Sequence, residues 1–210
     1  MIRILITDDH AILRKGLKET LEQELGKVTF GEAENARQAL EQVRKETWDL
    51  MLLDIDMEGQ SGLEVLEDIQ RSAPKLPVLI LSMYPEAEFA VRALKNGASG
   101  YLTKQSAPEE LITAVRKVLS GGRYVSPMLA ERLVSNLQRP TESLAHEALS
   151  NRELQVLRMV ATGKTVKEIA AELSLSIKTV ATHRARMLEK MQMQSDVEVA
   201  RYALRNKLVS

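Results

Sequence analysis

Residues 49–62 have the sequence DLMLLDIDMEGQSG, in which a short apolar run leads directly into Asp54. Turn residues follow at Gly59 and Gly62, and an apolar run closed in this way is typical of a strand buried on both faces of a parallel sheet. Open α/β sheets hold their ligands at the carboxyl ends of their strands, so the pattern predicts Asp54 at a ligand-binding edge. Taken alone, Asp54 is more simply explained as a turn cap, but two further segments change that interpretation.

Two other predicted strands also end in charged residues. The run IRILIT ends in Asp8 and Asp9, and the run YLT ends in Lys104. In one parallel sheet these strands would bring three carboxylates and one ammonium together. Clustered carboxylates repel one another unless they hold a hard cation such as Mg²⁺, and lysine is a suitable point charge for a phosphoryl group. The pattern therefore predicts Mg²⁺-dependent phosphoryl transfer to Asp54.

Residues 1–122 resemble the receiver domain of two-component response regulators. The resemblance is carried by acids after two strands, one glycine, and three residues on the last two strands: Asp8, Asp9, Asp54, Gly62, Ser82, Tyr101 and Lys104. It implies a flavodoxin-like α/β fold. Glu58 and Gln105 stand where the family usually has proline, which affects loop geometry rather than a group that does chemistry.

The same resemblance implies a role for each charged site residue. Asp54 would accept a phosphoryl group from the phosphohistidine of a sensor histidine kinase. Asp9 and Asp54 would bind Mg²⁺ together with the backbone carbonyl of Asp56, and Asp8 would act largely through water. Lys104 would bind the phosphoryl group.

Other residues would respond to that group. Ser82 and Tyr101 would form the switch pair that reports the phosphate to the outer face. Asp56 and Tyr84, two residues after Asp54 and Ser82, would flank the phosphoryl group, and we expect the bulk of Tyr84 to slow its hydrolysis.

Composition and charge indicate a globular chain with two unlike parts. The 210 residues are enough for two small domains, and the hydrophobic content of 44% is ordinary. Residues 1–122 carry 15 Lys and Arg against 20 Asp and Glu, whereas residues 150–210 carry 11 against six. A basic C-terminal part favours nucleic acid as a partner, although chance imbalance would also produce it. Cysteine, a signal peptide and a membrane-length apolar run are absent from the sequence, so we expect a cytoplasmic protein without disulfides.

Periodicity predicts that strands and helices alternate through residue 122. Strands are expected near residues 2–7, 27–33, 49–53, 77–81 and 100–102, and helices near 11–24, 36–46, 61–73, 86–97 and 108–120. Apolar stripes support the helices, the first of them formed by Leu13, Leu17 and Leu21. Capping boxes are expected at Ser61/Glu64 and Ser106/Glu109. Five strands alternating with five helices indicate a doubly wound five-stranded parallel sheet.

A linker is predicted at residues 123–148. Two glycines end the last receiver helix, and residues 127–137 are compatible with one further helix before the run RPTES breaks the pattern. The predicted domains are therefore a receiver at residues 1–122 and an all-α domain at residues 149–210.

The C-terminal domain is predicted to contain four helices. They are expected near residues 151–162, 166–173, 177–191 and 196–207. Ser176 is the predicted N-cap of the third, and the others begin at capping boxes, Ser150/Glu153, Thr165/Glu168 and Ser195/Glu198. The second and third helices have helix-turn-helix proportions, which favours a recognition helix in the DNA major groove. An ordinary amphipathic helix with a solvated basic face would have the same pattern.

Motifs across this domain resemble the LuxR-type helix-turn-helix module of regulators in the NarL/FixJ class. The matching segments are LSNRELQVL at residues 149–157, Gly163, KEIA at residues 167–170 and SIKTVATH at residues 176–183. The resemblance implies that Thr182 and its neighbours face bases, while Lys178, Thr179 and His183 mostly contact phosphates. We expect Arg184 and Arg186 to neutralise phosphates as well.

These features predict a phosphorylation-controlled DNA-binding transcriptional regulator, which is no enzyme beyond slow loss of its own phosphate. Its DNA module is small and has few basic residues, so we expect a phosphorylation-promoted homodimer on an inverted DNA repeat. The expected dimer contact is the helix at residues 196–207, through Val197, Ala200, Tyr202 or Leu204.

Two other functions are compatible with parts of the sequence. Asp54-Ile55-Asp56 after a buried strand also resembles the two-acid motif of haloacid-dehalogenase-type phosphoaspartyl hydrolases. Glu58 replaces the threonine or valine of that motif, and Ser82 stands where an acid pair is expected. The other alternative is a ligand-sensing LuxR-type receptor, whose sensor domain would need a roomy cavity rather than an acidic strand edge.

Overall fold

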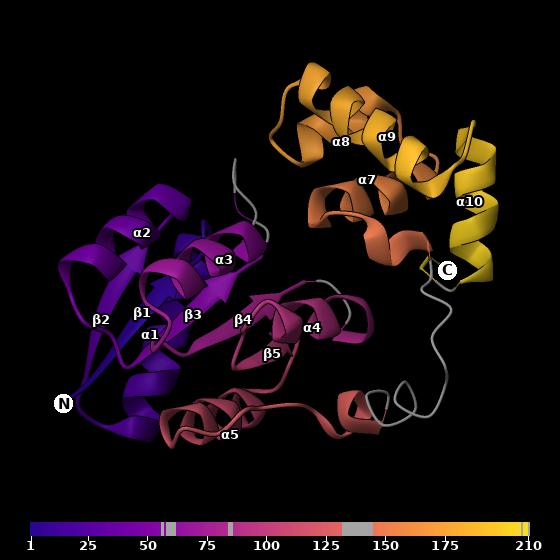
Figure 1. Cartoon of the computed structure of the whole chain (residues 1–210). Coiled ribbons are helices and arrows are strands. Elements are labelled where there is room, and N and C mark those ends of the chain that lie inside the picture. The colour runs from indigo at the N-terminus through magenta and orange to yellow at the C-terminus, as the bar shows by residue number, and fades with distance from the viewer. Residues whose placement is uncertain (56, 58–61, 84–85, 132–144, 207, 210) are drawn as a thin grey trace. The chain divides into compact units, whose positions relative to one another are not determined.

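A five-stranded parallel sheet organises the N-terminal unit, residues 1–138 (Figure 1). The computed structural model describes residues 1–55, 57, 62–83, 86–131, 145–206 and 208–209. The strands, in the spatial order β2-β1-β3-β4-β5, are β1 Ile2–Thr7, β2 Val28–Ala33, β3 Leu50–Asp54, β4 Val78–Ser82 and β5 Gly100–Thr103. They alternate with α1 Ala11–Leu25, α2 Ala36–Lys45, α3 Gly62–Ser72, α4 Glu86–Lys95 and α5 Pro108–Leu119. The predicted doubly wound sheet is confirmed.

The sheet is buried on both faces, which explains its apolar strands. Every residue of β3 and β4 is buried. Helices α1 and α5 cover one face, where Leu21 and Val115 join the core built on Leu52. Helices α2, α3 and α4 cover the other face (Figure 1), which holds the fully buried Phe89 and Tyr101.

The start of α5 differs from the predicted capping box. Ala107 is the N-cap and Pro108 is the first helical residue, so Ser106 lies one residue too early to cap the helix. The Ser106 hydroxyl instead lies 3.1 Å from Thr103 Oγ1. The other predicted box of this unit depends on Ser61, which lies outside the described residues.

The first residues of the predicted linker pack on the N-terminal unit. Tyr124 N donates to Ser99 O at 2.8 Å, and the Tyr124 hydroxyl donates to Glu110 Oε1 of α5 at 2.9 Å. Ser126 Oγ donates to the buried carboxylate of Glu86, the first residue of α4. A helical turn begins at residue 127, as predicted, and the rest of the predicted helix lies outside the described residues.

The described residues of the C-terminal unit, residues 139–210, form four α-helices after a short 3-10 helix. These elements are η1 Ala145–Ala148, α7 Asn151–Ala161, α8 Val166–Glu172, α9 Ile177–Met191 and α10 Asp196–Arg205. Capping boxes start α7 at Ser150 and α8 at Thr165, as predicted. Ser176 caps α9 by accepting from Thr179 N at 3.0 Å. The predicted four-helix domain is confirmed.

Two short connections define how the helices of this unit follow one another. Ser195 accepts from Glu198 N at 3.3 Å, but the Glu198 carboxylate accepts from Gln194 N at 2.7 Å, so the predicted box at α10 is half formed. Between α8 and α9, Ser174 has a positive φ of 51°, and Leu175 N donates to Ala170 O at 2.9 Å. This tight turn sets the helix-turn-helix pair.

Candidate phosphoryl-transfer site and nucleic-acid interface

Three strand ends meet at the carboxyl edge of the sheet, as the sequence predicts. Lys104 Nζ, just beyond β5, lies 2.7 Å from Asp54 Oδ2 at the end of β3 and 2.8 Å from Asp8 Oδ2 beyond β1. The side chains of Lys104, Asp54 and Asp8 are 7%, 1% and 2% exposed. The edge therefore holds a buried ammonium shared by two buried carboxylates.

Backbone contacts fix this edge. Lys104 N donates to Ser82 O at 2.8 Å, which ties the end of β5 to the end of β4. Gly62 N donates to Ile55 O at 2.9 Å at the start of α3. A Cβ at Gly62 would come within 2.0 Å of Asp54 O, so only glycine allows α3 to approach the residue that carries the site.

The pKa of Lys104 is raised above its ordinary value. Burial alone would lower it, but the nearby negative charges of Asp54 and Asp8 and their hydrogen bonds outweigh burial. Lys104 therefore remains a cation at neutral pH and can bind a phosphoryl oxygen.

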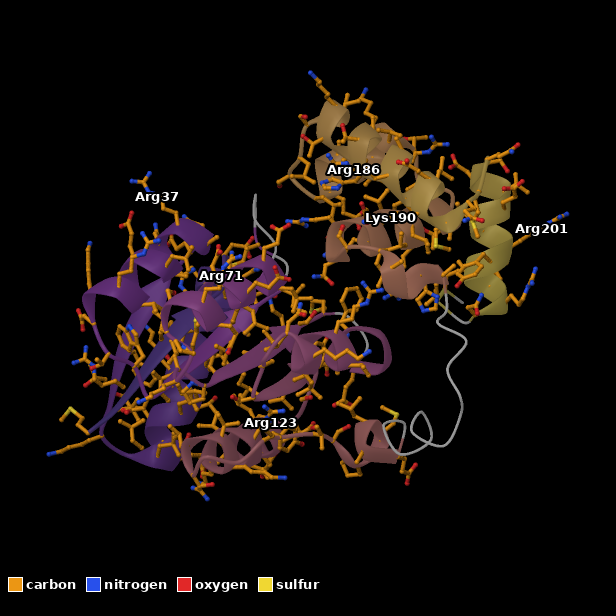
Figure 2. The ribbon with its side chains drawn as sticks, viewed as in Figure 1. Arg37, Arg71, Arg123, Arg186, Lys190 and Arg201 are labelled. Carbon is orange, nitrogen blue, oxygen red and sulfur yellow. The ribbon has the colours of Figure 1, made fainter. Side chains whose placement is uncertain are left out.

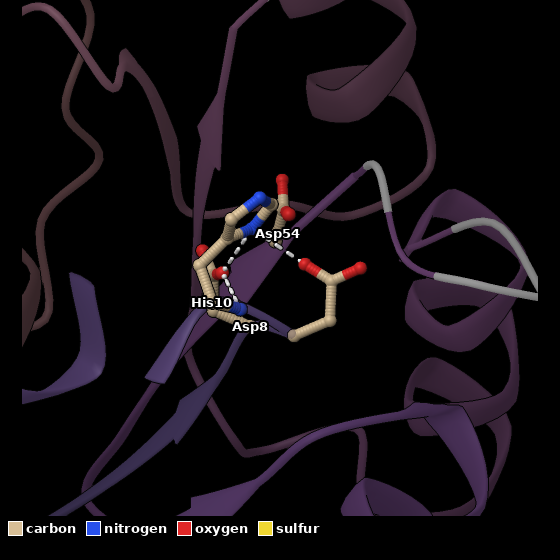
Figure 3. A group of neighbouring side chains, drawn as sticks. Asp8, His10 and Asp54 are labelled. Atoms are coloured by element: carbon tan, nitrogen blue, oxygen red, sulfur yellow. Dashed lines mark hydrogen bonds and ion pairs between the residues drawn. The ribbon is translucent and has the colours of Figure 1, made fainter. Parts of the chain in front are cut away.

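The same edge offers ligands for a divalent cation. Asp8, Asp9, His10 and Asp54 each place one ligand atom so that all four atoms lie within 4.8 Å of one another (Figure 3). Carboxylate oxygens are the donors that Mg²⁺ prefers, so the three acids fit this ion. His10 is largely exposed at the mouth of the cluster, and its Nδ1 lies 2.6 Å from Asp9 Oδ1. The predicted carbonyl ligand, Asp56, lies outside the described residues.

The predicted switch residues are both fully buried. Ser82 ends β4, and Tyr101 stands on β5 opposite Ile80 in the strand register. The Tyr101 side chain thus lies inside the protein in this structure. Tyr84, the predicted shield of the phosphate, lies outside the described residues.

Sequence reasoning missed one buried residue beside the site, Arg14 of α1. Its guanidinium donates to the backbone carbonyl of Asp8 at 2.7 Å. The buried stripe of α1 is Arg14, Leu17 and Leu21, whereas Leu13 is only half-buried. The available signal was spacing: Arg14 precedes Leu17 by three residues and Leu21 by seven, which places all three on one face of a helix.

The predicted DNA contacts on α9 divide into two groups. Lys178, Thr182 and Arg186 are exposed, whereas Thr179, His183 and Arg184 are half-buried. Figure 2 labels Arg186 together with Lys190 of the same helix. The side chains of Lys178, Thr182 and Arg186 therefore lie on the surface of α9.

Two basic side chains of α9 form ion pairs within the C-terminal unit. Arg184 Nε and NH2 lie 3.0 and 2.8 Å from Asp196 Oδ1, at the start of α10. Lys190 Nζ lies 2.7 Å from the buried Glu153 Oε2 of α7. Sequence reasoning did not predict either ion pair, and both anchor α9 to neighbouring helices.

The predicted dimer helix presents an apolar edge. Val197 and Leu204 of α10 are 65% and 59% exposed, and Ala200 between them is half-buried. Tyr202 is also half-buried, and its hydroxyl lies 2.8 Å from His146 Nδ1. Val197 and Leu204 are therefore available to a partner, while Tyr202 is used within the unit.

Comparison with known proteins matches both parts of the chain. The model of the response regulator receiver domain matches residues 4–116, and that of the luxR family of bacterial regulatory proteins matches residues 147–203. The response regulator UvrY of Escherichia coli strain K12 is 37% identical, and the match covers 99% of this chain and 96% of UvrY. The N-terminal part therefore matches a receiver domain and neither a haloacid-dehalogenase-type hydrolase nor the sensor domain of a ligand-sensing LuxR-type receptor.

Solved structures of RcsB are similar over nearly the whole chain. RcsB of Salmonella enterica serovar Typhimurium, bound to promoter rprA in the presence of the phosphomimetic BeF3-, is 27% identical with a TM-score of 0.64, covering 96% of this chain and 98% of that one. A structure of two RcsB dimers bound to two parallel DNAs is 26% identical with a TM-score of 0.59, covering 96% and 97%.

Among the described residues, no helix has the length and apolar character needed to cross a membrane. The acidic sheet edge, the helix-turn-helix unit and the two family matches lead to one conclusion. The chain belongs to the response regulators of the NarL/FixJ class, and it is a phosphorylation-controlled DNA-binding transcription regulator rather than an enzyme.

Proposed function

We propose that Asp54 is the phosphoacceptor, that Asp8, Asp9 and Asp54 hold Mg²⁺, and that Lys104 binds the transferred phosphoryl group. One observation carries the proposal: the buried Lys104 ammonium lies 2.7 Å from the buried Asp54 carboxylate and 2.8 Å from the buried Asp8 carboxylate. Asp8 also contacts the lysine, but it follows β1, whereas Asp54 is itself the last residue of the central strand β3.

The proposed reaction moves a phosphoryl group from a histidine of a sensor kinase. One Asp54 carboxylate oxygen attacks phosphorus, an acyl phosphate forms, and the phosphorus–nitrogen bond to the imidazole breaks. Mg²⁺, when bound, neutralises charge on the phosphoryl oxygens. Lys104 then exchanges one of its carboxylate contacts for a phosphoryl oxygen. The phosphate leaves only by slow hydrolysis, so labelling is stoichiometric.

The proposal assigns three further groups around the phosphate. The backbone carbonyl of Asp56 would be a further protein ligand of Mg²⁺. Ser82 and Tyr101 respond to the phosphoryl group as the switch pair. Their burial supports this assignment. Because Ser82 and Tyr101 are packed among other residues, a movement of either side chain on phosphorylation would displace those neighbours.

The output is proposed to be DNA binding by a homodimer. Thr182 would contact base edges, and Lys178, Thr179, His183, Arg184 and Arg186 would contact phosphates. Val197, Ala200 and Leu204 of α10 would form the dimer contact on an inverted repeat. The exposed Val197 and Leu204, and RcsB dimers bound to DNA, support this arrangement.

The remaining parts of the proposal concern organisation. We propose a receiver at residues 1–122, a linker at residues 123–148 whose first part packs on the receiver, and a DNA-binding domain at residues 149–210. The family matches at residues 4–116 and 147–203 support a division into these two domains. A regulator that binds a promoter acts where the chromosome is, so we place the protein in the cytoplasm.

The test is phosphorylation by a small phosphodonor such as phosphoramidate, with and without Mg²⁺. Wild-type protein is expected to gain one hydroxylamine-sensitive phosphate in a Mg²⁺-dependent manner, and Asp54→Asn none. Asp68→Asn, an acid on α3 that forms a surface ion pair with Arg71, is the matched control and should label normally. A hydroxylamine-sensitive phosphate on Asp54→Asn would refute the assignment.

A further inference from the structure

Arg14 of α1 is a buried cation that the proposed phosphoryl chemistry does not use. Its side chain is only 7% exposed, next to the strand end that carries the acid pair. Burying a guanidinium is unfavourable unless partners satisfy its charge and its donors. The identity of those partners indicates the function of Arg14.

The guanidinium is satisfied on three sides by groups from two segments. NH1 donates to Asp8 O at 2.7 Å, Nε donates to Glu32 Oε2 at 3.0 Å, and NH2 donates to Glu34 Oε1 at 2.8 Å. Burial alone would lower the pKa of Arg14, but its bonds and charge interactions with Glu32 and Glu34 outweigh burial and raise it. The planar fork of arginine can meet three acceptors in this way, whereas a lysine ammonium is a point charge.

Arg14 completes the anchoring of one peptide at the end of β1. Asp8 N donates to Ala33 O at 3.1 Å, at the end of β2, and Asp8 O accepts from Arg14. Both polar groups of the Asp8 main chain are thus fixed to neighbouring elements. Because Asp9 is the next residue, the same anchoring limits where both carboxylates lie.

The charge of Arg14 is balanced by its neighbours. Two glutamates and one further cation, Lys18, surround the guanidinium, and Lys18 forms an ion pair with Glu32. The formal charges of these four side chains cancel. The direct link between Arg14 and the acid pair is the hydrogen bond from its guanidinium to Asp8 O.

We propose that Arg14 is a positioning residue for the divalent-cation site, because it holds the Asp8 carbonyl between α1 and β2 and thereby fixes the Asp8–Asp9 pair. The inference rests on the proposed binding of Mg²⁺ by Asp8, Asp9 and Asp54. Loss of a group that orients metal ligands typically lowers metal affinity by about 10–100-fold. We expect an effect in this range for Arg14→Gln, and a smaller one for Arg14→Lys.

The experiment measures Mg²⁺ binding to the full chain by calorimetry and by the rise in Tm that Mg²⁺ causes. The rise is taken within each variant, with and without Mg²⁺, so a variant that is merely less stable does not give a false result. Lys18→Gln is the matched control, because it loses a bond to Glu32 but touches neither Asp8 nor Asp9. It should bind Mg²⁺ as the wild type does.

Each outcome has a defined meaning. Weaker Mg²⁺ binding in Arg14→Gln with normal binding in Lys18→Gln supports the inference. Equal Mg²⁺ affinity in wild type and Arg14→Gln, or an equal loss in Lys18→Gln, overturns it. If Arg14→Gln does not fold, unchanged Mg²⁺ affinity in Arg14→Lys overturns it instead. The variant Asp9→Asn distinguishes failure of the Arg14 inference from failure of the proposed Mg²⁺ site. Normal Mg²⁺ binding in Asp9→Asn contradicts the proposed site itself.

Discussion

Glu153 of α7 offers a sharp test of how the DNA-binding unit is held together. Its side chain is 3% exposed, and one carboxylate oxygen, Oε2, accepts from both Ser150 N and Lys190 Nζ at 2.7 Å. That oxygen closes the N-terminal cap of α7 and also anchors the end of α9. The substitution Glu153→Gln keeps the shape of the side chain and removes its charge.

The magnitude follows from the two bonds. Hydrogen bonds to a charged group contribute about 1.5–3 kcal/mol and neutral ones about 0.5–1.5 kcal/mol, so weakening two bonds would cost about 2 kcal/mol. Lys190 is 41% exposed, so water restores part of the loss at its ammonium. We expect the C-terminal unit to lose about 1–2 kcal/mol, which is roughly a 5–30-fold change in its folded-to-unfolded ratio.

Amide hydrogen exchange of the full chain measures this locally. Amides of α7 and α9 in Glu153→Gln should exchange faster by that factor at pH 7, while those of the β-sheet should not change. Glu172→Gln is the control, because Glu172 is an exposed partner of Lys164 and should change exchange little. Equal exchange of α7 and α9 amides in wild type and Glu153→Gln would refute the reasoning.

The effect should also depend on pH. Burial alone would raise the pKa of Glu153, but the hydrogen bonds from Lys190 and Ser150 outweigh it and lower the pKa. A carboxyl group with a lowered folded-state pKa stabilises the fold fully above its unfolded value, which is about 4.3, and this contribution disappears as pH falls through the folded value. The difference between wild type and Glu153→Gln should therefore be constant near neutral pH and vanish in acid.

Three further outcomes are expected. Lys104→Met should bind Mg²⁺ more tightly in calorimetry, because the ammonium no longer competes for Asp54 and Asp8, yet phosphorylation should no longer promote DNA binding; unchanged Mg²⁺ affinity would contradict this. Gly62→Ala should lower the stability of the receiver in thermal melts by about 1–3 kcal/mol, because a Cβ would come within 2.0 Å of Asp54 O; an unchanged Tm would count against the close approach. Arg186→Ala should weaken binding to all DNA sequences alike and lower the salt slope by about 1, whereas Thr182→Ala should relax preference at one position by about 1–3 kcal/mol; identical effects on specific and random DNA would remove the distinction.

The sequence was sufficient for the elements that depend on local signals. The run into Asp54 marks β3 because both faces of that strand are buried. Ser150, Thr165 and Ser176 cap α7, α8 and α9, and each cap is formed with the residue three positions later. Such short-range signals can be found in the sequence alone. The convergence of Asp8, Asp54 and Lys104 was also predictable, since parallel strands bring their carboxyl ends to one edge.

What the sequence did not predict depends on pairing between distant residues or on competition at one position. Arg184 meets Asp196 twelve residues later, and nothing in the helical pattern marks that pair. The side-chain partners of Arg14 are Glu32 and Glu34, which lie far from it in the sequence. The apolar spacing of α1 therefore predicted a buried stripe of leucines and did not reveal that Arg14 is buried. At α5, the helix begins at Pro108 instead of at the capping box predicted from Ser106, because the fixed φ of proline suits the first helical position.

The packed segment at residues 123–131 changes where the protein can be cut and rejoined. Its Leu129 is 1% exposed, and a Cβ at Gly100 would meet Tyr124 O at 2.9 Å, so strand and segment are fitted to each other. A chimaera joined at Gly122 would expose the apolar surface on which Leu129 packs. It would also remove the hydrogen bond from Ser126 to the Glu86 carboxylate. As a module for recombination, the receiver therefore extends at least to residue 131, and grafts of a foreign output domain should keep that segment.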